Sequence, residues 1–203
     1  MIKFQKHIFL YFFLILIGCE RTQLEWEDPT IFQINKEPPR AHFFTYNSIS
    51  LAKKLNPSLS NYFQSLNGDW KFSFSKNIKD RPKNFYKSNY DDSDWSKIMV
   101  PGNWELQGWS FPIYLDEEYP FPVNPPFVPH DYNAVGSYRK AFNIPKSWEE
   151  NDIFLRLGSV RSAFYIWVNG EFVGYSQGSK TPADFNISEF VNVGGNNIAI
   201  QVY

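Results

Sequence analysis

The sequence predicts an all-β protein, an antiparallel β-sandwich of the jelly-roll type. From residue 66 onward, apolar and polar side chains alternate in short segments, which is typical of half-buried strands. Connections rich in proline and glycine separate these segments, and a helical pattern occurs only once. Since 43% of the 203 residues are hydrophobic and 19% are aromatic, the chain can fill one sizeable core. Many short strands around one core favour a two-layered sandwich.

The N-terminal half contributes one expected helix and one expected strand. "NSISLAKKL", residues 47–55, predicts a short helix with Asn47 or Ser48 as its N-cap. "GDWKFSFS", residues 68–75, places aromatic side chains at every second position, so that one face of a strand is apolar.

The C-terminal half contributes the remaining strands. "DIFLRLGSV", residues 152–160, is more continuously apolar and predicts a strand covered on both faces. Residues 162–176 read as a hairpin, because Asn169-Gly170 joins two apolar runs and is favoured in type I′ turns. A Gly194-Gly195 turn then leads to a last alternating strand that is still open at Tyr203. We therefore expect the sandwich to lack its final strand or strands.

Charge and cysteine content exclude several classes of function. The net charge is −1 and no basic run is present, which argues against a nucleic-acid partner. A single cysteine, Cys19, rules out an internal disulfide, and three scattered histidines give no zinc-binding spacing.

The first 18 residues have the layout of a secretory signal peptide. Two lysines precede an apolar run over residues 8–17, which is too short to span a bilayer because a spanning helix needs about 20 residues. "LIGC", ending at Cys19, resembles a bacterial lipobox, in which the cysteine is lipidated. We expect Cys19 to be lipidated and the protein to be exported and anchored to a bacterial membrane. The alternative is an ordinary cleaved signal with an incidental cysteine.

One hydrogen-bonding side chain, Asn124, lies within the proline-rich stretch "FPVNPPFVP", residues 121–129. Proline fixes φ and removes a backbone donor, so this stretch should be a rigid, extended loop. The amide of Asn124 either bonds its own backbone, as in an Asx turn, or is held ready for a ligand.

Seven blocks of sequence, in order, resemble the N-terminal sugar-binding domain of the β-galactosidases of glycoside hydrolase family 2. They are "WEDPTIFQINKEPPRAHF", "SLNGDWKF", "VPGNWELQGW", "PIY", "YPFPVNPPFVP", "VGSYRKAF" and "VNGEFVGYSQGSKTPADFNIS". The resemblance implies a jelly roll of the galactose-binding-domain type over residues 61–203, after an N-terminal extended linker with a short helix over residues 19–60. It also implies a separate TIM-barrel domain with two catalytic glutamates, both outside this chain, that cleaves terminal β-D-galactosides with retention.

The resemblance further implies two substrate-binding residues. In the family, the asparagine that matches Asn124 projects into the galactose pocket. Asn186 stands where well-known members have an aspartate that contacts galactose and a sodium ion. A neutral amide still offers an oxygen but lacks the charge, so sodium binding at Asn186 would be weakened. The family enzymes use Mg²⁺ and Na⁺, and no cofactor is expected for this chain alone.

Three hypotheses of function follow. The first is the N-terminal portion of a β-galactosidase, inactive by itself, with a β-galactoside and the missing catalytic barrel as partners. The second is a free-standing carbohydrate-binding lipoprotein, and the third is a non-functional remnant that cannot fold. The C-terminus discriminates between the first two, because a true binding module should close its sheet.

Overall fold

The computed structural model describes residues 24–113 and 121–203. The expected signal peptide and Cys19 therefore lie outside the described residues. Within the two described ranges, no helix is long and apolar enough to cross a membrane.

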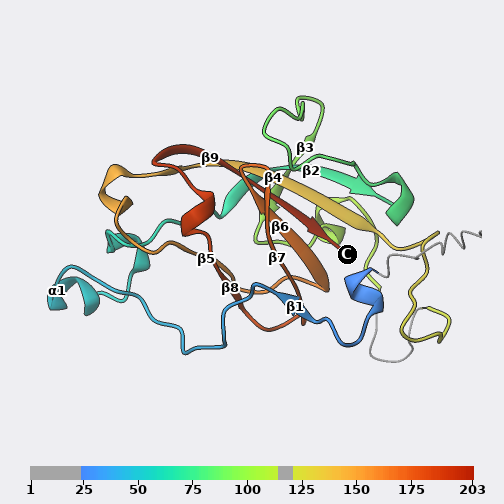
Figure 1. The fold of residues 1–203 in the computed structure, drawn as a ribbon, viewed down its shortest axis with the longest axis horizontal. Helices are drawn as coiled ribbons and strands as arrows, with labels where there is room; N and C mark the ends of the chain where they lie inside the picture. The colour runs from blue at the N-terminus through green and yellow to red at the C-terminus, as the bar shows by residue number, and fades with distance from the viewer. Residues whose placement is uncertain (1–23, 114–120) are drawn as a thin grey trace, which may run out of the picture.

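Two antiparallel sheets form the sandwich (Figure 1). The large sheet has seven strands in the order β1-β7-β6-β9-β4-β2-β3, and the small sheet pairs β5 with β8. The strands of the large sheet are β1 (Gln33–Ile34), β2 (Gly68–Ser75), β3 (Ser96–Val100), β4 (Val135–Ile144), β6 (Ala163–Val168), β7 (Glu171–Gln177) and β9 (Gly194–Val202). The small sheet consists of β5 (Phe154–Leu157) and β8 (Ala183–Asn186). The predicted antiparallel β-sandwich is thus confirmed.

Helical structure in the described residues is limited to single turns. The expected helix is present but shorter, as α1 (Ile49–Ala52), and the side chain of Ser48 accepts a hydrogen bond from Leu51 N at 3.3 Å. Leu55 has a φ of 51°, in the left-handed region, which ends the helical path soon after α1. The 3₁₀ turns are η1 (Glu25–Glu27), η2 (Pro57–Leu59), η3 (Ile78–Asp80), η4 (Glu105–Gln107), η5 (Lys146–Trp148) and η6 (Ser188–Phe190).

The main core lies between the two sheets. β2 buries Trp70 and Phe72 as its alternation predicts, and the small sheet contributes Phe185, which is fully buried. Gly174 of β7 is needed here, because a Cβ at this position would lie 2.5 Å from Ile34 O and 2.7 Å from the Phe185 ring. Packing of the two sheets against each other removes the apolar face of each from water, and this burial is the main contribution to the stability of the fold.

The predicted hairpin is confirmed as β6 and β7. Asn169 and Gly170 have φ values of 52° and 92°, as a type I′ turn requires. Val168 and Glu171 face each other at the end of the ladder.

Two predictions about strands need correction. The sequence predicts that residues 152–160 form an apolar strand covered on both faces, but β5 belongs to a two-stranded sheet with one apolar face. Leu155 is 6% exposed on the inner face, whereas Phe154 on the outer face is 38% exposed and is only partly covered, by Arg40. The expected Gly194-Gly195 turn is instead the beginning of β9, paired with Ile144 and Asn143. The side chain of Asn196 closes the preceding loop by hydrogen bonds to Asn192 and Gly194 O.

The last strand pattern of the sequence occupies the centre of the large sheet. β9 pairs with β4 on one side and with β6 on the other, so it is not an exposed edge. The edges of the large sheet are β1 and β3. The expectation that further strands complete the sandwich stays a prediction.

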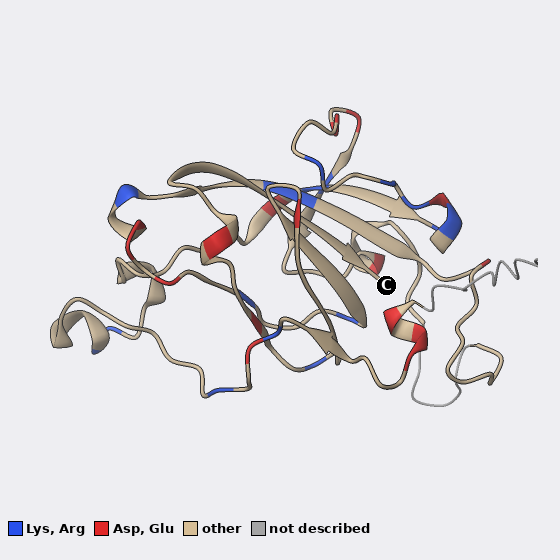
Figure 2. Ribbon diagram, in the orientation of Figure 1, with Lys and Arg blue, Asp and Glu red and all other residues tan. Residues whose placement is uncertain are grey.

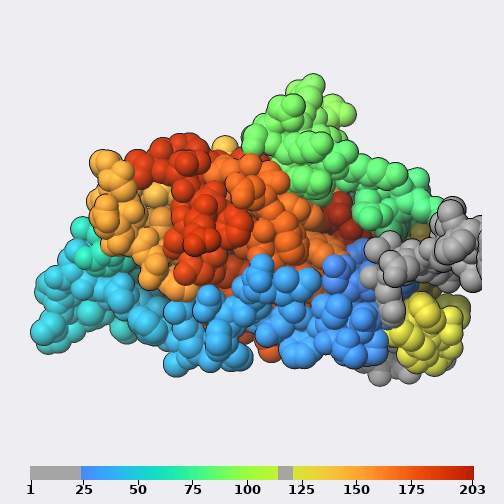
Figure 3. Space-filling view, viewed as in Figure 1, coloured from blue at the N-terminus to red at the C-terminus, as the bar shows by residue number. Residues whose placement is uncertain are grey.

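The segment that precedes β2 packs along the sandwich. In the space-filling view, the blue and cyan residues form a strip beside the orange strands (Figure 3). β1 pairs with β7, and Trp26 stacks on Tyr203 with ring centroids 4.2 Å apart. Charges of both signs are interspersed over the loops and strand ends (Figure 2).

Candidate functional site

Asn124 lies in the loop between η4 and β4, which the structure describes over residues 121–134. Its side chain is exposed, and a tight turn follows it because Phe127 N donates to Asn124 O at 2.8 Å. The Asn124 amide makes no hydrogen bond to any described residue. The Asx-type interpretation therefore finds no support in the described contacts, and the amide is available to a ligand.

A contact with the N-terminal segment anchors the far end of this loop. Glu27 of η1 is 7% exposed, and its Oε1 lies 2.6 Å from His130 Nε2 and accepts from Val128 N at 3.4 Å. We call this contact the Glu27–His130 latch. It restricts the loop that carries Asn124, which lowers the entropy lost when the amide binds a ligand.

Asn186, the second candidate, is held in a different way. It is the last residue of β8, and its Oδ1 accepts hydrogen bonds from Ser188 N at 3.0 Å and from Ser188 Oγ at 2.6 Å. This is an Asx turn that leads into η6. This turn could have been predicted from the sequence, because an asparagine followed two positions later by a serine is typical of an Asx turn.

A cavity of about 340 Å³ lies next to Asn186 and is lined by Asp152, Ser188, Glu189 and Phe190 as well. Carboxylate and hydroxyl oxygens can coordinate a hard cation such as Na⁺. However, the Asn186 oxygen is directed to Ser188, so in this arrangement it does not fit as a cation ligand. Among the described residues there is also no group of three or more His, Cys, Asp or Glu side chains that could hold a metal ion.

The described contacts do not bring Asn124 and Asn186 together. The loop over residues 121–134 contacts η1, whereas Asn186 faces Phe154 of β5 and caps η6. In Figure 1 the yellow loop lies at one end of the molecule, beside η1, and away from the label of β5. Asn124 is therefore the candidate that the geometry leaves free to act, and a shared sugar site stays a prediction.

Comparisons with known proteins agree with this architecture. Residues 63–203 match the family described as glycosyl hydrolases family 2, sugar binding domain. A β-galactosidase of Priestia megaterium (strain DSM 319 / IMG 1521) is 41% identical over 184 residues, which are 88% of this chain and 18% of that protein. One from Halalkalibacterium halodurans is 38% identical over 187 residues, 90% of this chain and 18% of that protein.

Solved structures show the same fold. A calcium-binding mutant of β-glucuronidase 2 from Bacteroides uniformis has a TM-score of 0.50 and 29% identity, covering 68% of this chain and 14% of that one. The β-glucuronidase of Bifidobacterium dentium has a TM-score of 0.51 and 18% identity, covering 68% of this chain and 19% of that one. The chain thus spans about 18% of the length of the curated relatives named above.

Proposed function

Because the chain belongs to glycosyl hydrolase family 2 through its sugar-binding domain, we propose that it supplies one wall of the galactose pocket of a β-galactosidase. The observation that carries this proposal is the exposed Asn124 amide, free of hydrogen bonds to the described residues and presented by an anchored, proline-rich loop.

An amide suits a sugar hydroxyl because both groups donate and accept hydrogen bonds. A single exposed hydrogen bond to a sugar replaces one to water and gives little net free energy. Asn124 should therefore orient a sugar that other residues enclose, and it should not be the main source of affinity.

The catalytic carboxyl groups are proposed to lie on a barrel domain that is separate from residues 24–203. Retaining hydrolysis of a glycoside needs two carboxyl groups about 5 Å apart, one as nucleophile and one as acid/base. In this proposal Asn124 only positions the sugar against that pair. We expect the 203-residue chain alone to show no turnover of a β-galactoside.

Export and membrane anchoring through lipidated Cys19 belong to the same proposal. Lipidation at this position would place the sugar-binding domain outside the cytoplasm, on the periplasmic side or at the cell surface.

The alternative is a free-standing carbohydrate-binding lipoprotein. It is favoured by one observation: β9 is paired on both sides, so the described sandwich has its own closed core. The two functions differ in affinity, because a module that works alone must enclose its sugar.

Calorimetric titration of galactose and lactose into the chain tests the proposal. We expect a Kd no tighter than about 1 mM, equivalent to about −4 kcal/mol. Micromolar affinity that Asn124→Ala abolishes and Asn67→Ala leaves intact would favour the free-standing module. Asn67 is a matched control, since it is also an exposed asparagine without a side-chain hydrogen bond to the described residues.

A second experiment tests the role of Asn124 in the assembled pocket. The chain is mixed with a related β-galactosidase that lacks its first domain, and hydrolysis of a chromogenic β-galactoside is followed. We expect the parent chain and Asn67→Ala to restore activity, and Asn124→Ala to restore at least about fivefold less, because one hydrogen bond is worth about 1 kcal/mol. Equal rescue by all three chains would contradict the proposal.

A further inference from the structure

A second apolar cluster covers the face of the large sheet that points away from the small sheet. Its buried members are Ala163, Tyr165 and Tyr175 of β6 and β7. Partly buried aromatic side chains pack against them, among them Trp26, Trp167 and Tyr203. This outer aromatic cluster is distinct from the core between the sheets, and no local sequence pattern indicates it.

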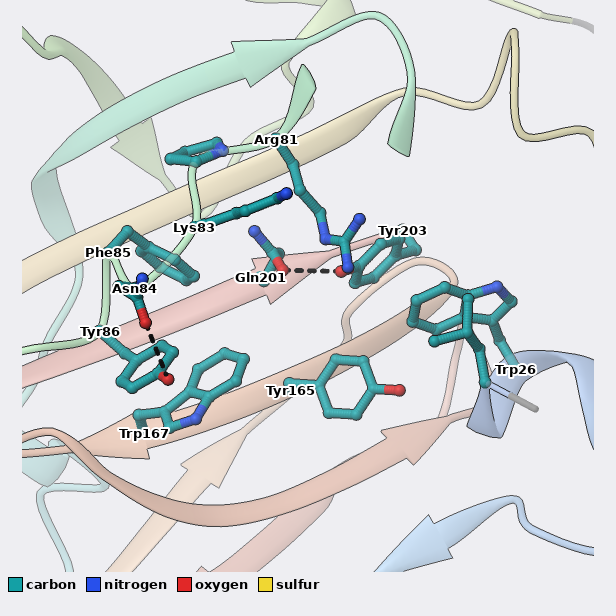
Figure 4. Close-up of a pocket in the computed structure, with 12 residues that line it drawn as sticks. Trp26, Arg81, Lys83, Asn84, Phe85, Tyr86, Tyr165, Trp167, Gln201 and Tyr203 are labelled. Atoms are coloured by element: carbon teal, nitrogen blue, oxygen red, sulfur yellow. Dashed lines mark hydrogen bonds between the residues drawn. The ribbon is translucent and has the colours of Figure 1, made fainter. Parts of the chain in front are cut away.

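A pocket of about 390 Å³ opens over this cluster (Figure 4). Two stacked pairs of rings bound it: Tyr86 lies on Trp167, with centroids 5.0 Å apart and planes 11° apart, and Trp26 lies on Tyr203. Tyr165 lies between the pairs, 5.9 Å from the centroids of both Trp167 and Tyr203. The volume is at the lower end of the range for small-ligand sites, about 300–1,000 Å³.

Polar groups surround these rings. Arg81, Lys83 and Asn84 come from the segment after η3. Figure 4 shows Arg81 and Lys83 across the pocket from Tyr165, and Asn84 beside Tyr86. Lys83 and Asn84 are exposed. Gln201 is 5% exposed, donates to Ser137 Oγ at 3.0 Å and accepts from Tyr203 Oη at 2.6 Å.

We propose that this pocket binds a pyranose sugar, at a site separate from Asn124. A pyranose has an apolar C–H face that can lie on aromatic rings and a rim of hydroxyl groups that donate and accept hydrogen bonds. The pocket offers both, with rings at its base and an amide and two cationic side chains at its edge. Neither Asn124 nor Asn186 is among the residues that line it.

The charged side chains around the pocket restrict the class of sugar that it can bind. Arg81 and Lys83 are cationic, whereas the neighbouring carboxylate of Glu25 accepts a hydrogen bond from Tyr165 Oη. A neutral or acidic sugar is therefore favoured over an amino sugar, whose ammonium group the two cations would repel. Since the proposal does not rest on Asn124, it can hold or fail independently of the galactosidase function.

The side-chain N–H signals of Trp26 and Trp167 provide a local readout by ¹H–¹⁵N NMR, assigned through Trp26→Phe and Trp167→Phe. Titration of the whole chain with D-galactose, D-glucose and D-glucuronate should shift both signals, with a millimolar Kd for at least one sugar. Asn124→Ala should leave these shifts and the Kd unchanged.

Two variants remove the two kinds of contact. Trp167→Ala, which removes a ring, should abolish the shift of the Trp26 signal. Asn84→Gly removes the rim amide and should weaken binding about fivefold, as expected for one hydrogen bond. Glycine accepts the φ of 58° at this position, so Asn84→Gly keeps the test decisive even if Trp167→Ala fails to fold. Asn67→Gly is the control and should bind as the parent does.

Four results would overturn the proposal. The first is the absence of any shift with all three sugars, and the second is binding that Asn84→Gly leaves unchanged. The third is a shift that depends on protein concentration and not on sugar, since a second copy of the chain would then cover the outer aromatic cluster. Loss of all shifts in Asn124→Ala would also overturn it, because the sugar would then occupy the Asn124 site alone.

Discussion

The Glu27–His130 latch should limit how often the loop that carries Asn124 opens. Glu27→Gln keeps the shape of the side chain but removes the charge that pairs with His130 Nε2 at 2.6 Å. The buried position of Glu27 strengthens the contact, while the His130 side chain is 43% exposed and partly screened by water.

The size of the effect follows from these two facts. A hydrogen bond to a charged group contributes about 1.5–3 kcal/mol when buried. Because one partner is nearly half exposed, we take a lower value of about 1–1.5 kcal/mol. Local opening of residues 121–134 should therefore become about five- to tenfold more frequent, since 1.4 kcal/mol is a factor of ten.

Hydrogen exchange followed by mass spectrometry measures this opening directly. Peptides from residues 121–134 should exchange faster in Glu27→Gln, while peptides from β4 and β9 should not change. Glu171→Gln is the matched control, because Glu171 is exposed at the start of β7. His130→Gln should act in the same direction, and the double variant should be no worse than Glu27→Gln, because both single changes remove the same interaction. Exchange in Glu27→Gln that equals that of Glu171→Gln would refute the reasoning.

Three other predictions concern stability and location. Gly136→Ala should lower the free energy of unfolding by about 1–3 kcal/mol in urea titrations, because a Cβ there would lie 2.4 Å from the Trp104 ring; an unchanged midpoint would contradict this packing. Burial, together with Glu25, raises the pKa of Tyr165 and Tyr175 above the usual 10.0, so stability should be fully present below about pH 10 and fall as the pH rises further; denaturation midpoints that stay constant up to pH 11.5 would argue against it. Cys19→Ser should abolish fatty-acid labelling and membrane association in cell fractions, and equal association of both proteins without any label would count against lipidation.

Sequence patterns predicted the parts of the fold that local rules decide. The alternation in β2 and the Asn169-Gly170 turn depend on residues within a few positions of each other, and both are confirmed. The burial of β5 could not be predicted, because it depends on how many strands join its sheet. A continuous apolar run is compatible with either one or two covered faces.

The candidate site was likewise predictable only in the parts that the local sequence determines. The proline-rich surroundings of Asn124 and the resemblance of its motif are enough to predict it as a candidate. The Glu27–His130 latch that anchors its loop could not be predicted, because the two residues lie 103 positions apart and no local pattern connects them. The outer aromatic cluster is equally non-local, since Trp26 and Tyr203 come from opposite ends of the chain.

The central position of β9 constrains how the domain can be made on the ribosome. β4 and β6 both precede β9 in the sequence, yet β9 lies between them and pairs with both. During synthesis, the nascent sheet must therefore stay divided in two halves until residues 194–202 have left the exit tunnel. Over that interval the facing edges of β4 and β6 expose unpaired backbone groups, which is when aggregation or capture by a chaperone competes with folding.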